Sequence, residues 1–219
     1  MKRRAFSTAL LGAGAAAMAC RATAQSQAQA SPVEGRQYVR LSQPLATGTA
    51  AGKIEVIEFF WYGCPHCSAF EPALESWSRR LPDDVVFRRV PVAFRPEPYV
   101  VHQRLFYALD GLGLVPGLQR KVFYAIHVER QRLDTPAEIG AFATKNGVDP
   151  AKLNDAMNSF STQVKLKQAN QLVDGYKIDG VPALGVQGRF YTSGTLAGDN
   201  ERALSVTDYL LQRLRSKAI

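Results

Sequence analysis

The chain is poor in cysteine. Its 219 residues include three cysteines, Cys20, Cys64 and Cys67, and Cys20 falls in a leader that we expect to be removed. The mature chain then keeps one pair separated by two residues, which is not the framework of a disulfide-stapled secreted domain. So short a loop restrains the unfolded chain little, because the entropic gain grows with loop length. A purely structural disulfide therefore explains the pair poorly.

Apolar runs long enough to cross a bilayer are also missing. The most apolar stretch, Phe6 to Ala19, is shorter than the roughly 20 residues that a membrane helix needs. Lys2, Arg3 and Arg4 precede it and Ala22-Thr23-Ala24 follow it, which is the order of regions in a secretory signal peptide. We expect residues 1–24 to be cleaved off and residues 25–36 to form a flexible leader.

Two alternatives concern this leader. The Arg3-Arg4-x-Phe6 pattern resembles a twin-arginine export signal, although adjacent arginines are common in basic leaders and we favour the general export route. Cys20 could carry a lipid anchor, but Ala17 stands where such a signal usually has a larger aliphatic residue. Either alternative leaves the protein exported.

Strong charge of one sign is absent from the mature chain. The whole sequence carries a net charge of +8. The leader holds four basic residues and no acid, which leaves about +4 for a chain of ordinary size. No basic run with interleaved aromatic residues is present, so we expect no binding to nucleic acid. The 46% content of hydrophobic residues predicts a folded globular protein with one core or one core and an insertion.

The most informative segment is Cys64-Pro65-His66-Cys67. It follows an apolar run, Val56 to Trp61, that is typical of a buried strand, and it precedes residues that favour a helix. A helix that begins at this motif places the first sulfur beside free backbone N–H groups, which favour an anion. Pro65 falls at the first helical residue, where its missing N–H costs nothing. The spacing indicates a redox-active dithiol.

The order of predicted elements is that of an α/β protein. Strands over 54–61 and 85–92 flank a helix that ends near residue 80, which makes a parallel βαβ unit. Helical patterns then run from about 98 to 176, with helix starts expected at Thr135-Pro136 and Asp149-Pro150. Strands over 183–186 and 189–192 flank the turn Gln187-Gly188, and a helix over 200–217 follows. We expect a βαβ half over 37–97, a helical insertion over 98–176 and a ββα half over 177–219.

Three stretches resemble the DsbA family of periplasmic thiol:disulfide oxidoreductases. Residues 58–67, EFFWYGCPHC, resemble its active-site strand and motif, and residues 180–184, GVPAL, resemble its cis-proline loop. The helical block matches the family's insertion in length and place. The resemblance implies a thioredoxin fold with an all-helical domain inserted between the βαβ and ββα halves. Trp61-Tyr62 and Gly185-Val186 depart from the fuller pattern, which bears on groove shape and substrate preference.

The motif residues have different expected roles. Cys64, at the helix start, is the expected nucleophile, because the thiolate is the form that attacks and leaves well. His66 lies between the cysteines and could stabilise that anion, or could be a solvated turn residue. Cys67 is expected to be buried and to resolve mixed disulfides. The resemblance implies a Cys64 pKa far below the ordinary thiol value, and hence a reduced form more stable than the oxidised one near neutral pH.

Three residues outside the motif complete the expected site. The resemblance implies a cis bond between Val181 and Pro182, with the Val181 backbone presented to an extended substrate. An ordinary proline at a strand edge is the alternative. Glu58 interrupts an apolar strand, where a carboxylate is expensive unless it is paired or protonated. We expect Glu58 to relay a proton for Cys67, and the alternative is an acid that faces solvent.

The resemblance also implies an activity and its partners. The protein is expected to donate the Cys64–Cys67 disulfide to reduced, newly exported proteins in the periplasm. It would need no cofactor and no metal, act as a monomer, and be reoxidised by a membrane quinone-linked oxidase of the DsbB type. A disulfide isomerase or reductase of the same superfamily is the nearest alternative. From a different class, Cys64, His66 and Cys67 could hold zinc or copper in a metal carrier, although zinc usually takes four ligands.

Overall fold

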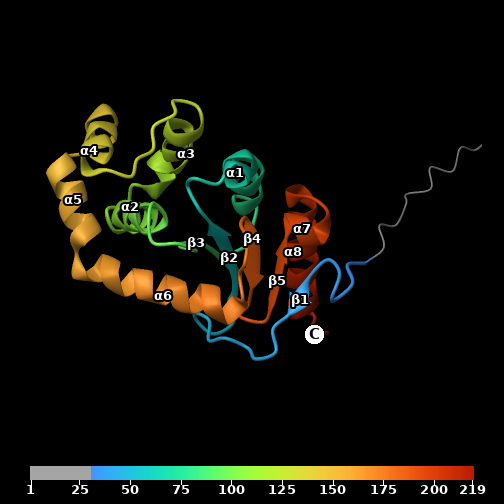
Figure 1. The fold of residues 1–219 in the computed structure, drawn as a ribbon. Coiled ribbons are helices and arrows are strands. Elements are labelled where there is room, and N and C mark those ends of the chain that lie inside the picture. Colours follow the sequence, from blue (N-terminus) through green and yellow to red (C-terminus); the bar gives the residue numbers. More distant parts are fainter. Residues whose placement is uncertain (1–30) are drawn as a thin grey trace, which may run out of the picture. The chain divides into compact units, whose positions relative to one another are not determined.

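The computed structural model describes residues 31–219, so the expected signal peptide and the first part of the expected leader lie outside the described residues. The described chain forms one mixed sheet of five strands in the order β1-β5-β4-β2-β3, with helices on both faces (Figure 1). The strands are β1 (Val39–Arg40), β2 (Ile54–Phe60), β3 (Val85–Pro91), β4 (Ala183–Val186) and β5 (Phe190–Ser193).

The first half of the sheet is the predicted βαβ unit. Strand β2 runs parallel to β3, with Ile54 opposite Val85 and Phe60 opposite Pro91. Helix α1 (Pro65–Ser78) connects the two strands. Six of the seven residues of β2 are buried, as expected for a strand in the middle of a sheet covered on both faces.

The second half is an antiparallel hairpin. Strand β4 pairs with β2 on one side and with β5 on the other. The connection between β4 and β5 comprises residues 187–189, one residue longer than the predicted turn Gln187-Gly188, because Val186 pairs with Phe190. Gln187 and Gly188 have positive φ, 52° and 62°, and the backbone N–H of Arg189 donates to the Val186 carbonyl at 3.0 Å. Two positive φ values at the centre of such a turn match the right-handed twist of the flanking strands. The predicted bounds of these two strands differ from the observed ones by at most one residue.

Between β3 and β4 the chain is helical throughout. Its helices are α2 (Tyr99–Gly111), α3 (Val115–His127), α4 (Pro136–Lys145), α5 (Pro150–Asn158) and α6 (Phe160–Tyr176). Two of the predicted starts are capped as expected. The Thr135 side chain accepts from the backbone N–H of Glu138, and the Asp149 side chain accepts from those of Ala151 and Lys152.

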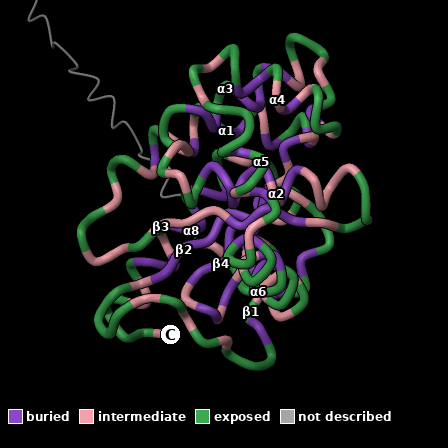
Figure 2. Tube along the Cα trace, turned by 90° about the vertical axis from the view of Figure 1, so that its left-hand side faces the viewer, coloured by how far each residue is buried: buried purple, intermediate pink, exposed green. Residues whose placement is uncertain are grey.

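Two cores lie on opposite faces of the sheet. On one face, side chains of α1 and of α8 (Asn200–Arg215) pack on β2, β4 and β5. On the other face, Ile57 and Phe59 belong to a second cluster that includes Tyr176 of α6 and buried side chains of α2 to α5. Phe60, which alternates with Phe59 along the strand, packs on Phe106 of α2 and Phe123 of α3. The short helix α7 (Gly194–Ala197) precedes α8. Figure 2 shows the buried residues gathered along the strands and the inner sides of the helices.

The start of the described chain corrects one expectation. Residues 31–36 were expected to belong to a flexible leader, but Gln37 donates from its backbone to Val33 and Gly35 donates to Tyr38. An ion pair joins Glu34 to Arg40 at 3.2 Å. These contacts lead directly into β1, which pairs with β5. Within the described part of the chain, no helix has the length and apolar character to span a membrane.

Candidate active site

The two cysteines lie at the junction between β2 and α1. Cys64 occupies the residue just before the helix, with an extended backbone, and Pro65 is the first helical residue. The backbone N–H of Cys64 donates to the carbonyl of Trp61, and the Cys64 carbonyl accepts from Ser68 at 3.1 Å. The sulfur of Cys64 is thus held at the end of α1 where the backbone N–H groups are free. Both cysteines are present as free thiols.

The surroundings of Cys64 favour its thiolate. Its pKa is lowered to about 6, first by a hydrogen bond from the Cys67 side chain, and further by the backbone N–H groups of Cys67 and His66 and by the charge of His66. Partial burial opposes these effects without cancelling them. The physical cause is that a helix start offers several donors to one anion.

Cys67 has the opposite environment. Its side chain is fully buried, and burial raises its pKa well above the ordinary thiol value. The neighbouring Cys64 and the carboxyl group of Glu58 raise it further. In the reduced protein this buried thiol stays protonated and donates to its neighbour. In the disulfide the same sulfur is a poor leaving group until a proton reaches it.

A cleft opens beside Cys64. The Val181–Pro182 peptide bond is cis, as the resemblance implied, and the carbonyl oxygen of Val181 lies 3.5 Å from the Cys64 sulfur. The cleft has a volume of about 800 Å³ and is lined by His66, by the loop that carries Pro182 and by the segment around Thr195. His66 itself is exposed. Cys64 does not line the cleft itself, but Val181, whose carbonyl oxygen contacts the Cys64 sulfur, does.

Glu58 is completely buried, so the alternative of a solvent-facing acid is wrong. One of its oxygens accepts from Nε of Arg89 at 2.9 Å, and Arg89 also donates to Glu71 of α1 at 2.5 Å. The pKa of Glu58 is raised to about 8, first by burial and also by the charge of Glu71, against the opposing effect of Arg89. Burial likewise raises the pKa of Glu71. Two carboxyl groups that share one guanidinium can hold a proton near neutral pH.

The loop between β2 and Cys64 is fixed by the helical segment. The Tyr62 hydroxyl donates to Oε1 of Gln119 at 2.7 Å, and Nε2 of His127 lies 2.8 Å from the Tyr62 carbonyl. Trp61 stacks on Tyr99, with ring centroids 4.0 Å apart. A Cβ on Gly63 would lie 2.3 Å from the Trp61 ring, so the approach of that ring requires glycine. Helices α2 and α3 therefore position the residues that lead into the motif.

The structure brings the predicted site residues together from three segments of the chain. Cys64, Pro65, His66 and Cys67 come from the junction, Val181 and Pro182 from the loop before β4, and Glu58 from β2. Sequence reasoning missed Arg89 and Glu71. A pair of arginines in the otherwise apolar strand 85–92 was the available signal, because a cation facing a core needs a buried partner. Among residues 31–219, no three His, Cys, Asp or Glu side chains gather as a metal site would require.

Comparisons with known proteins agree with this geometry. A family model described as the DSBA-like thioredoxin domain matches residues 55–202. The thiol:disulfide interchange protein DsbA of Burkholderia cepacia is 38% identical over 217 residues, which covers 99% of this chain and 100% of that protein. The protein of the same name from Bordetella bronchiseptica is 44% identical over 209 residues, covering 95% of this chain and 97% of that one.

Solved structures are similar over the same range. The crystal structure of Pseudomonas aeruginosa DsbA has a TM-score of 0.81 and 40% identity, and the match covers 85% of this chain and 96% of that one. Reduced DsbA1 from Neisseria meningitidis has a TM-score of 0.74 at 27% identity, covering 86% of this chain and 97% of that one. The predicted fold, with helices inserted between a βαβ and a ββα half, is confirmed.

Proposed function

This chain belongs to the DSBA-like thioredoxin family and is a thiol:disulfide oxidoreductase, and from that premise we propose that it transfers its Cys64–Cys67 disulfide to newly exported proteins in the periplasm. The observation that supports this direction is the difference between the two sulfurs. Cys64 has a pKa of about 6 beside an open cleft, while Cys67 is buried with a raised pKa. A stabilised thiolate favours the reduced enzyme and hence oxidation of the client.

The exchange takes two steps in this proposal. A client thiolate attacks the Cys64 sulfur, the bond between Cys64 and Cys67 breaks, and Cys67 leaves and takes up a proton. A second client thiolate then attacks the client sulfur of this mixed disulfide, and Cys64 leaves as the thiolate. The client loses two electrons and gains a disulfide, and the enzyme gains the two electrons as a dithiol. The low pKa makes Cys64 the better leaving group in the second step.

The other site residues assist without taking part in covalent bonds. Pro65 starts the helix that supplies the N–H groups, and His66 adds a positive charge beside the Cys64 anion. Val181 offers its backbone to the client and Pro182 holds that backbone at the sulfur, a form of strand addition. Glu58 supplies the proton that Cys67 takes up.

The cellular setting completes the proposal. The basic and apolar leader of residues 1–24 would direct export, and a quinone-linked membrane oxidase of the DsbB type would reoxidise the dithiol. The dithiol carries the electrons itself, so the protein would act as a monomer without a prosthetic group. Support comes from the leader composition and from the relationship to DsbA proteins.

Replacement of each cysteine tests the assignment. We expect Cys64→Ser to abolish oxidation of a reduced client, because the attacked sulfur is gone. We expect the Cys64 thiolate of Cys67→Ser to attack a client that already carries a disulfide and to accumulate the mixed disulfide, because a buried resolving thiol is missing. Thiol titration of a reduced, unfolded client measures the first outcome, and non-reducing gels with a disulfide-containing client measure the second. Substantial client oxidation by the Cys64→Ser protein would refute the assigned roles.

Glu58→Gln tests the proton transfer. Glutamine keeps the size and the hydrogen bond to Arg89 but cannot titrate. Because the pKa of Glu58 is about 8, we expect the parent's rate of mixed-disulfide exchange to change near that pH, and the variant to lack this change and to react about tenfold more slowly at neutral pH. A pH profile unchanged by the substitution would show that Glu58 is only structural.

A further inference from the structure

The outer edge of β3 carries backbone N–H and C=O groups that form no hydrogen bond with any described residue. The backbone N–H of Ile54 donates to Asp84 and that of Val92 donates to Phe60, each at 2.8 Å. In a parallel ladder, alternate residues of a strand bond to the same neighbour, so Phe87 and Arg89 direct their N–H and C=O groups away from β2. Within residues 31–219, none of these four groups has a hydrogen bond.

These unpaired backbone groups lie between two residues of β3 that are hydrogen-bonded on the same edge. At the start of the strand, the N–H of Val85 donates to the Pro82 carbonyl at 2.9 Å. At its end, the carbonyl of Pro91 accepts from the side chain of Gln103 at 2.7 Å. Two donors and two acceptors thus remain, spaced as in one strand of a sheet. Native proteins usually cover or shorten such an edge, because it can pair with another chain.

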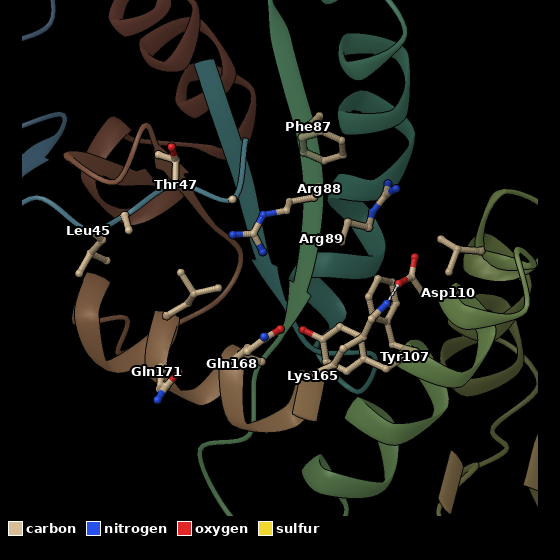
Figure 3. A pocket seen from close by; sticks show the side chains of 16 residues that line it. Leu45, Thr47, Phe87, Arg88, Arg89, Tyr107, Asp110, Lys165, Gln168 and Gln171 are labelled. Carbon is tan, nitrogen blue, oxygen red and sulfur yellow. Dashed lines mark hydrogen bonds and ion pairs between the residues drawn. The ribbon is translucent and has the colours of Figure 1, made fainter. Parts of the chain in front are cut away.

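A cleft of about 730 Å³ runs beside this edge. Residues 87–89 of β3 form one side of the cleft, and helices α2 and α6 form the other, as Figure 3 shows with Tyr107, Lys165 and Gln168. Leu45, Phe106 and Leu172 add apolar surface. The cleft therefore combines an unpaired strand edge with apolar walls, which is the composition of an extended-peptide site.

The charges in the cleft are already matched. Arg88 pairs with Glu55 at 3.0 Å, and Lys165 pairs with Asp110 at 2.5 Å. Arg89 is engaged by the buried carboxyl groups of Glu58 and Glu71. A charged side chain of a ligand would find no free partner here and would lose hydration, so an uncharged segment fits best.

We propose that an uncharged, extended segment of an unfolded client pairs with β3 at Phe87 and Arg89 and becomes a sixth strand of the sheet. An unfolded chain supplies the alternating donors and acceptors that this edge lacks, and its exposed apolar side chains suit the walls of the cleft. The choice of a client as the occupant rests on the proposed function. The site is distinct from the cleft at Pro182, so one client could be held at two places while its cysteine reacts.

Hydrogen exchange on the full chain tests the pairing directly. The probe is a cysteine-free peptide of alternating valine and threonine with blocked ends, about eight residues long, which is the length of a short strand. We expect the amides of Phe87 and Arg89 to gain about tenfold or more protection when it binds. The amide of Arg88 is a built-in control, because it already faces β2 and should not change. Binding without protection at Phe87 and Arg89, or no binding, overturns the proposal.

Two matched comparisons sharpen the test. N-methylation of only the valines or only the threonines removes the donors from one edge of the peptide at a time. Pairing at one edge predicts that one of these peptides binds nearly as well as the parent and that the other binds about tenfold or more weakly. Gln168→Trp should obstruct the cleft and weaken binding, whereas Gln163→Trp, also exposed on α6 but outside the cleft, should not. Equal affinities in both comparisons would refute the pairing.

Other occupants would give different results. Concentration-dependent dimerisation that protects Phe87 and Arg89 would assign the edge to a second copy of this chain and overturn the proposal. Protection of these amides in the monomer before peptide is added would assign the edge to residues 1–30 and overturn it equally. Neither result touches the thiol chemistry, because the probe has no cysteine and client oxidation through Cys64 is measured separately.

Discussion

Cys64 and Cys67 are separated by two residues, yet their surroundings move their pKa values in opposite directions. A hydrogen bond from the Cys67 thiol, followed by free N–H groups at the start of α1, lowers the pKa of Cys64, whereas burial against the core raises that of Cys67. One turn of helix is enough for this difference, because it takes the second sulfur from the helix end into the interior. The motif alone predicted the roles of the sulfurs, since both causes are local.

The stability of the two redox forms should depend on pH. The Cys64 pKa is lower in the folded, reduced protein than in the unfolded chain, about 6 against an ordinary value of about 8.5. The resulting stabilisation is complete above the unfolded value and is lost as the pH falls toward 6. After a discount for solvent contact it amounts to about 2 kcal/mol at pH 8.5 and about 1 kcal/mol at pH 7.

A disulfide that closes so short a loop contributes about 2 kcal/mol by chain entropy. We therefore expect the oxidised protein to have the higher free energy of unfolding at pH 6, and the difference between the two forms to disappear as the pH rises to 8.5. The reduced form is then not clearly the more stable one at neutral pH. Urea unfolding of both forms across this range measures the difference. A difference that does not vary with pH would contradict a lowered Cys64 pKa in the folded protein.

For Glu58, the sequence predicted burial but not the residues that pair with it. Its place in an apolar strand predicted a buried, functional carboxyl group, and it is buried. Its partners could not be predicted, because Arg89 lies 31 residues away along the chain and comes close only through the register of β2 with β3. In the sequence Arg89 and Glu71 are ordinary charged residues.

At the scale of elements, local patterns predicted most bounds. Helix α1 follows from proline at its first residue, and the β4–β5 hairpin follows from Gln187-Gly188 between two apolar runs. The sequence predicted the helical block as a whole and some of its starts. It could not predict which helix faces which, because α3 is joined to the loop before Cys64 by long-range contacts of Gln119 and His127 with Tyr62.

Gly188 is expected to be the most sensitive residue of the hairpin. Its φ is +62°, and an added Cβ would lie 2.2 Å from the carbonyl oxygen of Leu45. We expect Gly188→Ala to lower the free energy of unfolding by about 2 kcal/mol or more, through the strained backbone and the displaced Leu45 segment. Urea unfolding measures the loss.

Gly117→Ala is the matched control for this change. Gly117 lies inside α3, and an added Cβ there meets no atom within 4 Å. Alanine favours the helix over glycine by up to about 1 kcal/mol, so this variant should be as stable as the parent or more stable. Equal losses in both variants would show that the Leu45 contact is not the cause.

At the scale of the whole molecule, the inserted helices and the sheet share one core around the site. His102 of α2 is buried against Trp61 and Tyr62, with ring centroids 6.0 and 6.3 Å apart. Its Nε2 lies 3.0 Å from the Arg132 carbonyl, and its Nδ1 has no partner within the described chain. This buried environment favours a neutral imidazole, because a charged one would carry a second buried N–H without a partner.

Acid should therefore weaken the contact between helices and sheet. Burial lowers the pKa of His102 below its ordinary value of 6.5, although the Arg132 carbonyl and Asp134 act against this. The stabilisation from the neutral side chain is complete above 6.5 and is lost as the pH falls below it. Glu58 acts with the opposite sign between about pH 4.5 and 8, because its folded pKa is raised, so the parent's curve alone cannot isolate His102.

The comparison that isolates it is the parent against His102→Gln. Glutamine can still donate to the Arg132 carbonyl but does not titrate, and the contribution of Glu58 is common to both proteins. We expect the free energy of unfolding of the parent to fall relative to that of the variant as the pH is lowered from 7 to 5. Near-ultraviolet circular dichroism should report the loss through Trp61 and Tyr62, which pack beside His102. A constant difference between the two proteins across this range would mean that the pKa of His102 is the same in the folded and the unfolded protein, and that burial in the core shared by helices and sheet does not disfavour its charged form.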